Sequence, residues 1–380
     1  MPLPKSYTLP LVAFLLSVGC KQNYLPLVIS NPPSLLVVDG FLNNSINDTT
    51  YIKLSRTNKL SEGVVNSAEL NAVLSIEDES GNILYTSSEN GGGSYIFPGI
   101  SLDPDQHYKL RIHTNNGQEY LSDILSGATT PPIDSIGFDK TGKGVDIHVN
   151  THDDQNKTLY YRWEYNETFQ YHATYYSGLI FPGDGSYQFR QPDQQIYECW
   201  KSEPSTQLLL ASSANLERDI IYKRILRHVD QDAVELSLKY FIKVKQYALT
   251  KGAYEYLQNL KKLTENAGGL FDVQPSELGG NIHNVTNPGE DALGYITVAT
   301  SQTSEIYFTN AQVQPWNYKL DCSIWEIKPN QIPNHTSPDE IIGLGLDGGP
   351  YNLKGLYVTT RECGDCQVVG GITTRPDFWQ

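Results

Sequence analysis

The clearest hydrophobic pattern in the chain lies in its second half. From Val234 to Leu249 apolar and polar side chains alternate, and this period of two predicts a half-buried β-strand. After Thr250, a suitable N-cap, the apolar spacing changes to three and four residues, which predicts a helix over 250–267. Gly268 ends this helix, and a further strand is expected at Gly294–Ala299. The apolar face of the helix consists of Ala253, Tyr254, Leu257, Leu260 and Leu263.

Short apolar runs separated by turn residues fill the N-terminal part of the chain. The clearest turn is Asn116-Gly117, because both residues tolerate the positive φ that a tight hairpin requires. Turns at intervals of about 8–12 residues predict a β-sandwich over residues 34–127. The stretch from Ala72 to Ile112 resembles the prealbumin-like domains of exported bacterial proteins. The expected strands are Leu35–Phe41, Thr50–Ser55, Ala72–Glu77, Ile83–Ser87, Ser94–Phe97, His107–Thr114 and Gln118–Leu125.

A proline-containing linker, Ala128–Ile133, precedes a second β-region. We expect an immunoglobulin-like or fibronectin-like sandwich over 133–313, with an insertion at 178–230 and the helix on its surface. Tyr161, Trp163 and Tyr165 share one face of a strand. A tryptophan in this position is typical of a sandwich core, and the alternative is an aromatic platform for a ligand. The segment Leu216–Val229 fits a helix or a strand, and residues 314–380 lack periodicity, which predicts an irregular, loop-rich tail.

The N-terminus has the features of a bacterial lipoprotein signal. Lys5 is followed by an apolar run, Leu9–Val18, which is too short to span a bilayer, and then by Gly19-Cys20. We therefore expect residues 1–19 to be a signal peptide, Cys20 to carry acyl chains, and residues 20–33 to be a tether. The alternative is an ordinary secreted protein in which Cys20 has no such role.

Composition and charge exclude some functions. The formal net charge is −15, and a strongly acidic surface repels phosphate backbones, so nucleic acid is not an expected partner. The chain has 25 tyrosines but a single methionine, a composition that suits β-sheets and wet surfaces. Its length fits two domains.

The sequence gives little support for catalysis. It contains no nucleophile elbow, zinc-protease or nucleotide-binding motif, so we expect no enzyme and no cofactor. His148 and His152 lie near Asp153-Asp154, but these aspartates read as a solvated turn. Asp103 and Asp105 could hold calcium, although an Asp-Pro turn is the simpler interpretation. No metal site is therefore predicted.

Four cysteines besides Cys20 suggest disulfides in an exported protein. They are Cys199, Cys322, Cys363 and Cys366, and four cysteines allow three connectivities. Because Phe378 and Trp379 lie close to the C-terminus, we expect Cys363 and Cys366 to bond to Cys199 and Cys322, in either order, and so to dock the tail. The alternatives are a local Cys363–Cys366 bridge, a zinc site and free thiols.

Several stretches together resemble one family. They include YECWKSE around Cys199, YFIKVKQYALTKGAYEYL from Tyr240, and the ending ECGDCQVVGGITTRPDFWQ. The resemblance is to a family of Bacteroidota lipoproteins known as domain of unknown function four-two-four-nine. It implies an exported lipoprotein on the outer membrane beside a TonB-dependent receptor. Lys21-Gln22-Asn23 departs from the acidic residues that often mark surface export in that phylum, so the periplasmic face stays open beside the cell surface.

These observations lead to one main hypothesis and two alternatives. The main hypothesis is a non-enzymatic binding lipoprotein that assists a TonB-dependent transporter in nutrient uptake. A structural or adhesive surface protein built from β-sandwiches is the first alternative, and an unrecognised hydrolase is the second. The sequence does not identify the ligand.

Overall fold

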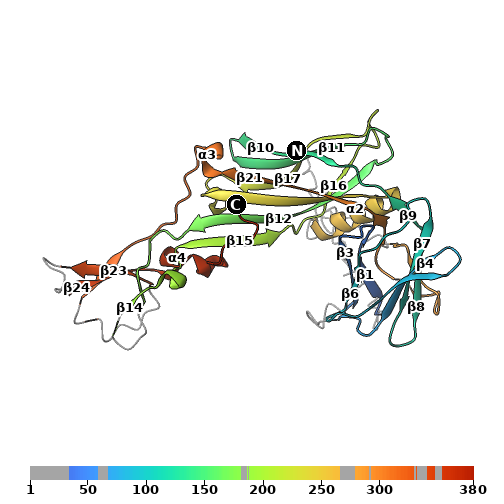
Figure 1. The fold of residues 1–380 in the computed structure, drawn as a ribbon, viewed down its shortest axis with the longest axis horizontal. Coiled ribbons are helices and arrows are strands. Elements are labelled where there is room, and N and C mark those ends of the chain that lie inside the picture. The colour runs from blue at the N-terminus through green and yellow to red at the C-terminus, as the bar shows by residue number, and fades with distance from the viewer. Residues whose placement is uncertain are drawn as a thin grey trace, which may run out of the picture.

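The structure is a computed structural model that describes residues 34–58, 67–180, 186, 188–265, 279–290, 292–328, 331, 340–346 and 353–380. The expected signal peptide, Cys20 and the tether lie outside these residues. The described chain is mainly β, as predicted, with few helices. It is elongated: the first domain lies at one end, the second domain forms the middle, and the tail projects at the other end (Figure 1).

The first domain packs two sheets around one core. Its inward positions alternate along each strand, so that Ile52 and Leu54 are fully buried while Tyr51 and Lys53 are exposed. The smaller sheet has the order β1 (Leu36–Gly40), β3 (Thr49–Arg56), β6 (Ser94–Pro98). The larger sheet contains β2 (Leu42–Asn43), β4 (Val73–Asp78), β5 (Ile83–Ser88), β7 (His107–His113), β8 (Glu119–Ser122), β9 (Leu125–Ala128), β19 (Ile282–Asn284) and β20 (Val298–Ala299).

Two of these strands come from a distant part of the chain. β19 pairs with β8, and β20 lies in parallel between β2 and β9. Ile282, Ile296 and Val298 are buried in the core of the first domain. The expected strand at Gly294–Ala299 therefore exists only in part, as β20, and it belongs to the first domain rather than to a second domain spanning 133–313. Local periodicity indicates a strand but does not say which sheet it joins.

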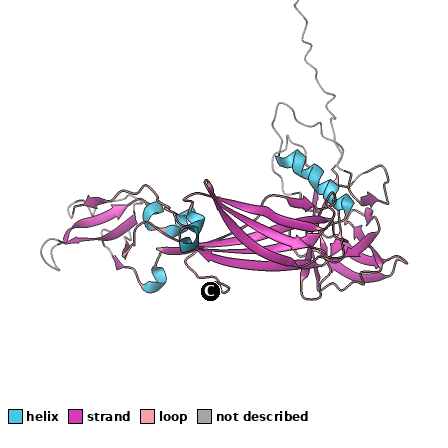
Figure 2. Ribbon diagram, turned by 90° about the horizontal axis from the view of Figure 1, so that it is seen from above, coloured by secondary structure: helices cyan, strands magenta, loops and turns pink. Residues whose placement is uncertain are grey.

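The second domain is a sandwich of two antiparallel sheets whose strands run along the long axis of the molecule (Figure 2). One sheet has the order β10 (Ile133–Thr141), β11 (Gly144–His152), β17 (Ile220–Asp230). The other, called here the long sheet, has the order β15 (Glu198–Pro204), β12 (Tyr160–His172), β18 (Lys239–Ala248), β21 (Ser301–Thr309), and β16 (Leu209–Ser212) also pairs with β12.

The predicted insertion at 178–230 is wrong for much of its length. β15, β16 and β17 are integral strands of the two sheets, and β17 resolves the ambiguity of Leu216–Val229 in favour of a strand. Its pairing with β11 contains register shifts, which break the alternation that would have identified it. The remainder of the predicted insertion includes the short pair β13 (Leu179–Ile180) and β14 (Gln188–Phe189) and a 3₁₀ turn, Pro192–Gln194.

The strand and helix predicted after Val234 are present with shifted limits. Val234–Leu236 forms a 3₁₀ turn, and the strand β18 begins at Lys239. Helix α2 (Lys251–Glu265) confirms the predicted helix, and Thr250 Oγ1 accepts a hydrogen bond from the N–H of Ala253 at 3.2 Å. Ala253 packs against the second domain. The ring of Tyr256 contacts that of Tyr295, with centroids 5.7 Å apart. Because Tyr295 belongs to the segment that returns to the first domain, the helix contacts both domains.

The tail is loop-rich, as expected, but it also contains a small sheet that the sequence pattern does not predict. Its order is β22 (Trp325–Ile327), β24 (Leu353–Thr359), β23 (Glu340–Leu346). Short helical turns flank it: α3 (Asn310–Val313), α4 (Arg361–Gly364) and the 3₁₀ turn Cys366–Val369. None of the helices that the structure describes is long and apolar enough to cross a membrane.

A buried amide connects the long sheet to the linker between the domains. Gln246 is fully buried, and its Oε1 accepts a hydrogen bond from Trp163 Nε1 at 2.8 Å. Its Nε2 donates to the carbonyl of Pro131 at 2.8 Å and to Thr151 Oγ1 at 3.0 Å. All three bonds are shielded from water, so losing them leaves buried polar groups without partners.

We therefore expect Gln246→Leu to lower the free energy of unfolding by about 2–4 kcal/mol, because it leaves the Trp163 N–H and the Pro131 carbonyl unpaired. Denaturant titration measures this loss, and the exposed Gln155→Leu serves as the control. Equal stability of the two variants would contradict the role assigned to Gln246.

Candidate functional site

The outward face of the long sheet carries charged side chains near the first domain. In β18, Ile242 and Val244 are buried in the core while Lys243 is exposed and Lys245 is half-buried. In the neighbouring strand β12, Glu164 lies directly opposite Lys245. Arg162 lies opposite Tyr247 in the same way. Because residues two apart on a strand share a face, these side chains meet on one surface.

The first domain contacts this surface through two interactions. Lys245 Nζ forms an ion pair with Asp48 Oδ2 at 2.6 Å, and the rings of Phe41 and Tyr247 meet edge to face with centroids 4.7 Å apart. Burial alone would raise the pKa of Asp48, but hydrogen bonds from Lys245 and from the N–H of Thr49 lower it below its ordinary value. Asp48 is therefore a carboxylate at neutral pH, which keeps the ion pair between the domains charged.

Arg162, Glu164 and Tyr247 form a compact polar cluster on the sheet. Glu164 Oε2 accepts a hydrogen bond from the Tyr247 hydroxyl at 3.0 Å, and its Oε1 accepts one from Arg162 Nη2. The Arg162 guanidinium lies 5.8 Å from the centroid of the Tyr247 ring. Burial, and then the charge of Glu164, raise the pKa of Tyr247 well above its ordinary value, so this hydroxyl remains a donor.

Two adjoining hollows open on this surface and share Arg162, Glu164 and Lys245 in their walls. One, of about 440 Å³, extends under residues 204–208, between β15 and β16. The other, of about 500 Å³, extends along the first domain past Asp48. Together they form what we call the junction groove. Sites for small ligands are of this size and often lie between domains.

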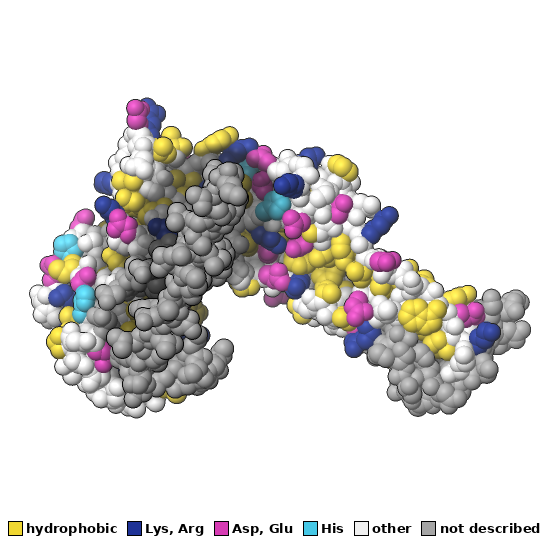
Figure 3. Space-filling view, turned by 180° about the vertical axis from the view of Figure 1, so that it is seen from behind, with side chains coloured by type: hydrophobic (Ala, Val, Ile, Leu, Met, Phe, Trp, Pro, Cys, Tyr) yellow, Lys and Arg dark blue, Asp and Glu magenta, His cyan; other side chains and the backbone are white. Residues whose placement is uncertain are grey.

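The charges around the first hollow differ from those of the whole protein. Its wall contains three cations, Arg162, Lys243 and Lys245, and one acid, Glu164, whereas the chain carries a net charge of −15. Elsewhere acidic and basic side chains are interspersed, as Figure 3 shows for one face. The hollow is therefore a locally cationic part of an acidic protein, and it favours an anionic ligand.

The aromatic platform considered for strand β12 is not available to a ligand. Tyr161 and Trp163 are fully buried in the core, where Tyr161 donates a hydrogen bond to Asp219. This agrees with the core interpretation, and the platform interpretation is wrong for these two residues. Tyr165 is half-buried and lines the first hollow, and burial, followed by the charge of Glu167, raises its pKa to about 12. Only Tyr165 of the three can contribute to a binding surface.

Two long-range disulfides are present, as predicted, and the structure shows which of the two orders left open by the sequence is formed. Cys199 bonds to Cys366 and Cys322 to Cys363, with Cα atoms 5.8 and 5.9 Å apart. This confirms the pinned tail and excludes the local Cys363–Cys366 bridge. Because all four sulfur atoms are in disulfides, none is a free thiol that could bind zinc or undergo redox exchange.

The disulfides place the C-terminus against the long sheet. Trp379 is buried against Trp200 and Phe241 on the outward face. Phe378 remains half-exposed, although its ring lies 5.0 Å from that of Phe241. Tyr307 donates a hydrogen bond to the Phe378 carbonyl at 2.6 Å. The tail therefore covers the end of the sheet far from the first domain, as predicted for Trp379, and leaves the junction groove open.

The weak metal candidates are not assembled into a site. Asp103 caps a turn, since its Oδ1 accepts from the N–H of Asp105 at 3.0 Å. His152 pairs with Asp134 at 2.7 Å, and His148 is buried in β11. Within the part of the chain that the structure describes, no group of three potential ligands could hold a metal ion.

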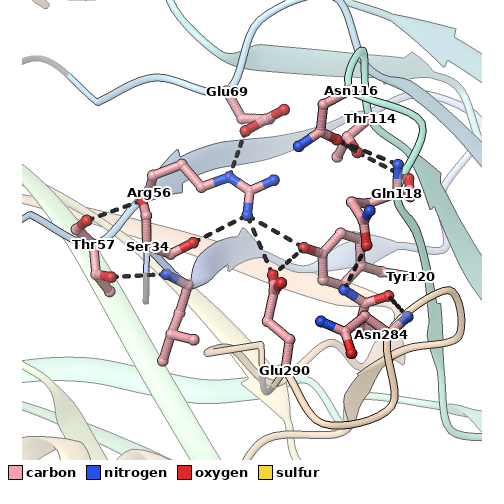
Figure 4. Close-up of polar contacts among 12 residues, drawn as sticks. Ser34, Arg56, Thr57, Glu69, Thr114, Asn116, Gln118, Tyr120, Asn284 and Glu290 are labelled. Carbon is pink, nitrogen blue, oxygen red and sulfur yellow. Dashed lines mark hydrogen bonds and ion pairs between the residues drawn. The ribbon is translucent and has the colours of Figure 1, made fainter. Parts of the chain in front are cut away.

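A second polar cluster fastens the returning segment to the first domain (Figure 4). Arg56 forms an ion pair with Glu69 at 2.6 Å and donates to the Tyr120 hydroxyl and to the Ser34 carbonyl, both at 3.2 Å. Tyr120 in turn donates to Glu290 Oε1 at 2.7 Å. Arg56 Nη2 is buried without a hydrogen-bond partner among the described residues, but the remaining contacts join strands of the first domain to the returning segment, so we assign the cluster a structural role.

The residues of the junction groove are only partly visible in the sequence. The alternation of β18 places Lys243 and Lys245 on its polar face, which is a signal for exposure but not for a site. Arg162 and Glu164 likewise lie on the polar face of β12. Their meeting with Asp48, 197 residues from Lys245, depends on how the domains dock.

The fold and site define a class: a two-domain β protein with a disulfide-pinned tail. The family model described as "Domain of unknown function (DUF4249)" matches residues 22–305, and the chain belongs to this family. No curated protein matches the chain significantly. A solved structure titled "Biofilm associated protein - BSP domain" aligns with 9% identity and a TM-score of 0.13, covering 74% of this chain and 61% of that one. A score this low carries no argument about fold or function.

The disulfides lead to a testable expectation. If a disulfide stabilises the fold by reducing the entropy of the unfolded chain, Cys199–Cys366, which spans 167 residues, contributes about 5 kcal/mol to the free energy of unfolding. Cys322–Cys363, which spans 41 residues, contributes about 4 kcal/mol. Cys199→Ser/Cys366→Ser should therefore lower the melting temperature and expose the tail to protease, with a smaller effect for Cys322→Ser/Cys363→Ser. Non-reducing peptide mapping of the unmutated protein checks the pairing itself. A Cys363–Cys366 peptide with Cys199 and Cys322 alkylatable would show the connectivity to be wrong.

Proposed function

We propose that the protein is a non-enzymatic binding lipoprotein of the cell envelope that assists a TonB-dependent outer-membrane transporter in nutrient uptake. The observation that carries this proposal is the junction groove, whose first hollow is of ligand size and has a cationic wall, and whose second hollow extends along the first domain. The lipoprotein signal and the family resemblance supply its location. The transporter is proposed from the resemblance alone.

The arrangement of the parts suits a tethered binding module. The described part of the first domain begins at Ser34, and a fully extended tether of residues 20–33 would reach at most about 50 Å. The tail lies at the opposite end of the long axis (Figure 1). A lipid at Cys20 therefore keeps the first domain close to the membrane and leaves the junction groove and the tail facing other molecules.

The tether is tested with Cys20→Ser. We expect the unmutated protein to stay in the membrane fraction after a high-salt wash and the variant to be released, because stable anchoring requires the acyl chains. Lys143→Glu, a substitution of an exposed residue outside the signal and the tether, serves as the control. Retention of Cys20→Ser in the washed membranes would contradict lipid anchoring.

The partner is tested separately by affinity capture of the unmutated protein from detergent-solubilised membranes. We expect to recover a large β-barrel of the TonB-dependent class. Repeated recovery of the lipoprotein by itself would overturn the transporter partnership. Loss of cell adhesion on deletion of the protein, with uptake unchanged, would favour the structural or adhesive alternative.

A further inference from the structure

We infer that the junction groove binds a small acidic saccharide, a sugar that carries a carboxylate. This inference rests on the proposed function of a binding protein and names the class of its ligand. Three features of the first hollow carry it: one cation that forms no ion pair, a set of neutral polar groups, and a covering segment that is held in place before a ligand binds.

The cation without an ion-pair partner is Lys243. In the same wall Arg162 is paired with Glu164, and Lys245 is paired with Asp48. Lys243 is exposed, and its ammonium has no ion-pair partner within 4 Å among the described residues. Glu305 lies opposite it on β21 but does not form an ion pair with it. The hollow therefore offers one ammonium that is not engaged in an ion pair, which matches a monovalent carboxylate better than a doubly charged phosphate.

Neutral polar side chains surround this lysine. Hydroxyl and amide groups both donate and accept hydrogen bonds, as sugar hydroxyls require. They come from β12, from the segment between β15 and β16, and from β21. The residues are Asn166, Ser205, Thr206, Gln207 and Thr303, and the apolar part of the wall includes Tyr165 and Leu208. A mixed wall of this kind suits a ring that has hydroxyl edges and apolar faces.

The segment that covers the hollow is held in place. The N–H of Ser205 donates to the Tyr165 carbonyl at 2.8 Å, and Ser205 Oγ accepts from the N–H of Tyr165 at 3.1 Å. Lys261 of helix α2 donates to the Leu208 carbonyl at 2.6 Å. Both ends of the segment are thus fixed before a ligand arrives, which reduces the entropy lost on binding. The volume of about 440 Å³ and the net charge of −15 also favour a small ligand over a polyanion.

The test is calorimetric titration of the full mature chain carrying Cys20→Ser. The probes are the disaccharides of galacturonic and glucuronic acid and N-acetylneuraminyl-lactose, each compared with its neutral methyl ester, and inorganic phosphate. We expect at least one acid to bind, its ester to bind at least tenfold more weakly, and the affinity to fall as salt rises. Lys243→Glu should weaken binding at least tenfold, Lys243→Arg should retain most of it, and Lys143→Glu should leave it unchanged.

Several results would overturn the inference. They are no binding by any of the acids, equal binding of acid and ester, equal loss in Lys243→Glu and Lys143→Glu, and phosphate binding at the same site with equal affinity. The melting temperature of each variant confirms that it is folded. Because the titration requires neither lipid nor transporter, its outcome is independent of the fractionation and capture experiments above.

Discussion

The structure depends on a small set of hydrogen bonds where the chain passes between its two domains. Thr130, in the linker, is buried, and its Oγ1 accepts from the N–H of Ala248 at 2.9 Å and donates to the Thr300 carbonyl. The N–H of Thr300 donates to the Ala128 carbonyl at 3.0 Å. Two crossings of the chain, after β9 and after β20, are thus bonded side by side, and the end of β18 is bonded to Thr130 and pairs with Ser301. Since backbone groups buried here have no access to water, separating the domains would leave them unpaired.

This junction explains why the two domains can build one site. Residues 279–299 complete a sheet of the first domain, and β21 begins immediately afterwards in the long sheet of the second. The ion pair of Asp48 with Lys245 and the contact of Phe41 with Tyr247 then form beside a fixed crossing instead of across a mobile linker. Each interaction is partly exposed and contributes little alone, but the crossing keeps the partners close. The junction groove is therefore formed in the absence of a ligand.

The sequence predicts the elements better than their partners. The period of two and the shift to three and four identify β18 and α2 because these depend on neighbouring residues. Long-range disulfides were predictable because two of the three possible connectivities dock Phe378 and Trp379, but the choice between those two depends on the fold. By contrast, the return of 279–299 to the first domain depends on pairing with β8 and β9, more than 150 residues away, and no local signal specifies it. The same holds for the site. Lys243 and Lys245 are recognisable from the sequence as part of a polar strand face, but the other walls of the hollow come from β12, β21 and residues 204–208.

The central claim, that the two domains form one cooperative body, is tested most directly by calorimetric unfolding of the protein. If residues 279–299 and the Thr130–Thr300 crossing bind the domains together, both must unfold together. We expect a single transition whose calorimetric enthalpy equals the van 't Hoff enthalpy. Two separate transitions, each with its own melting temperature, would contradict this account.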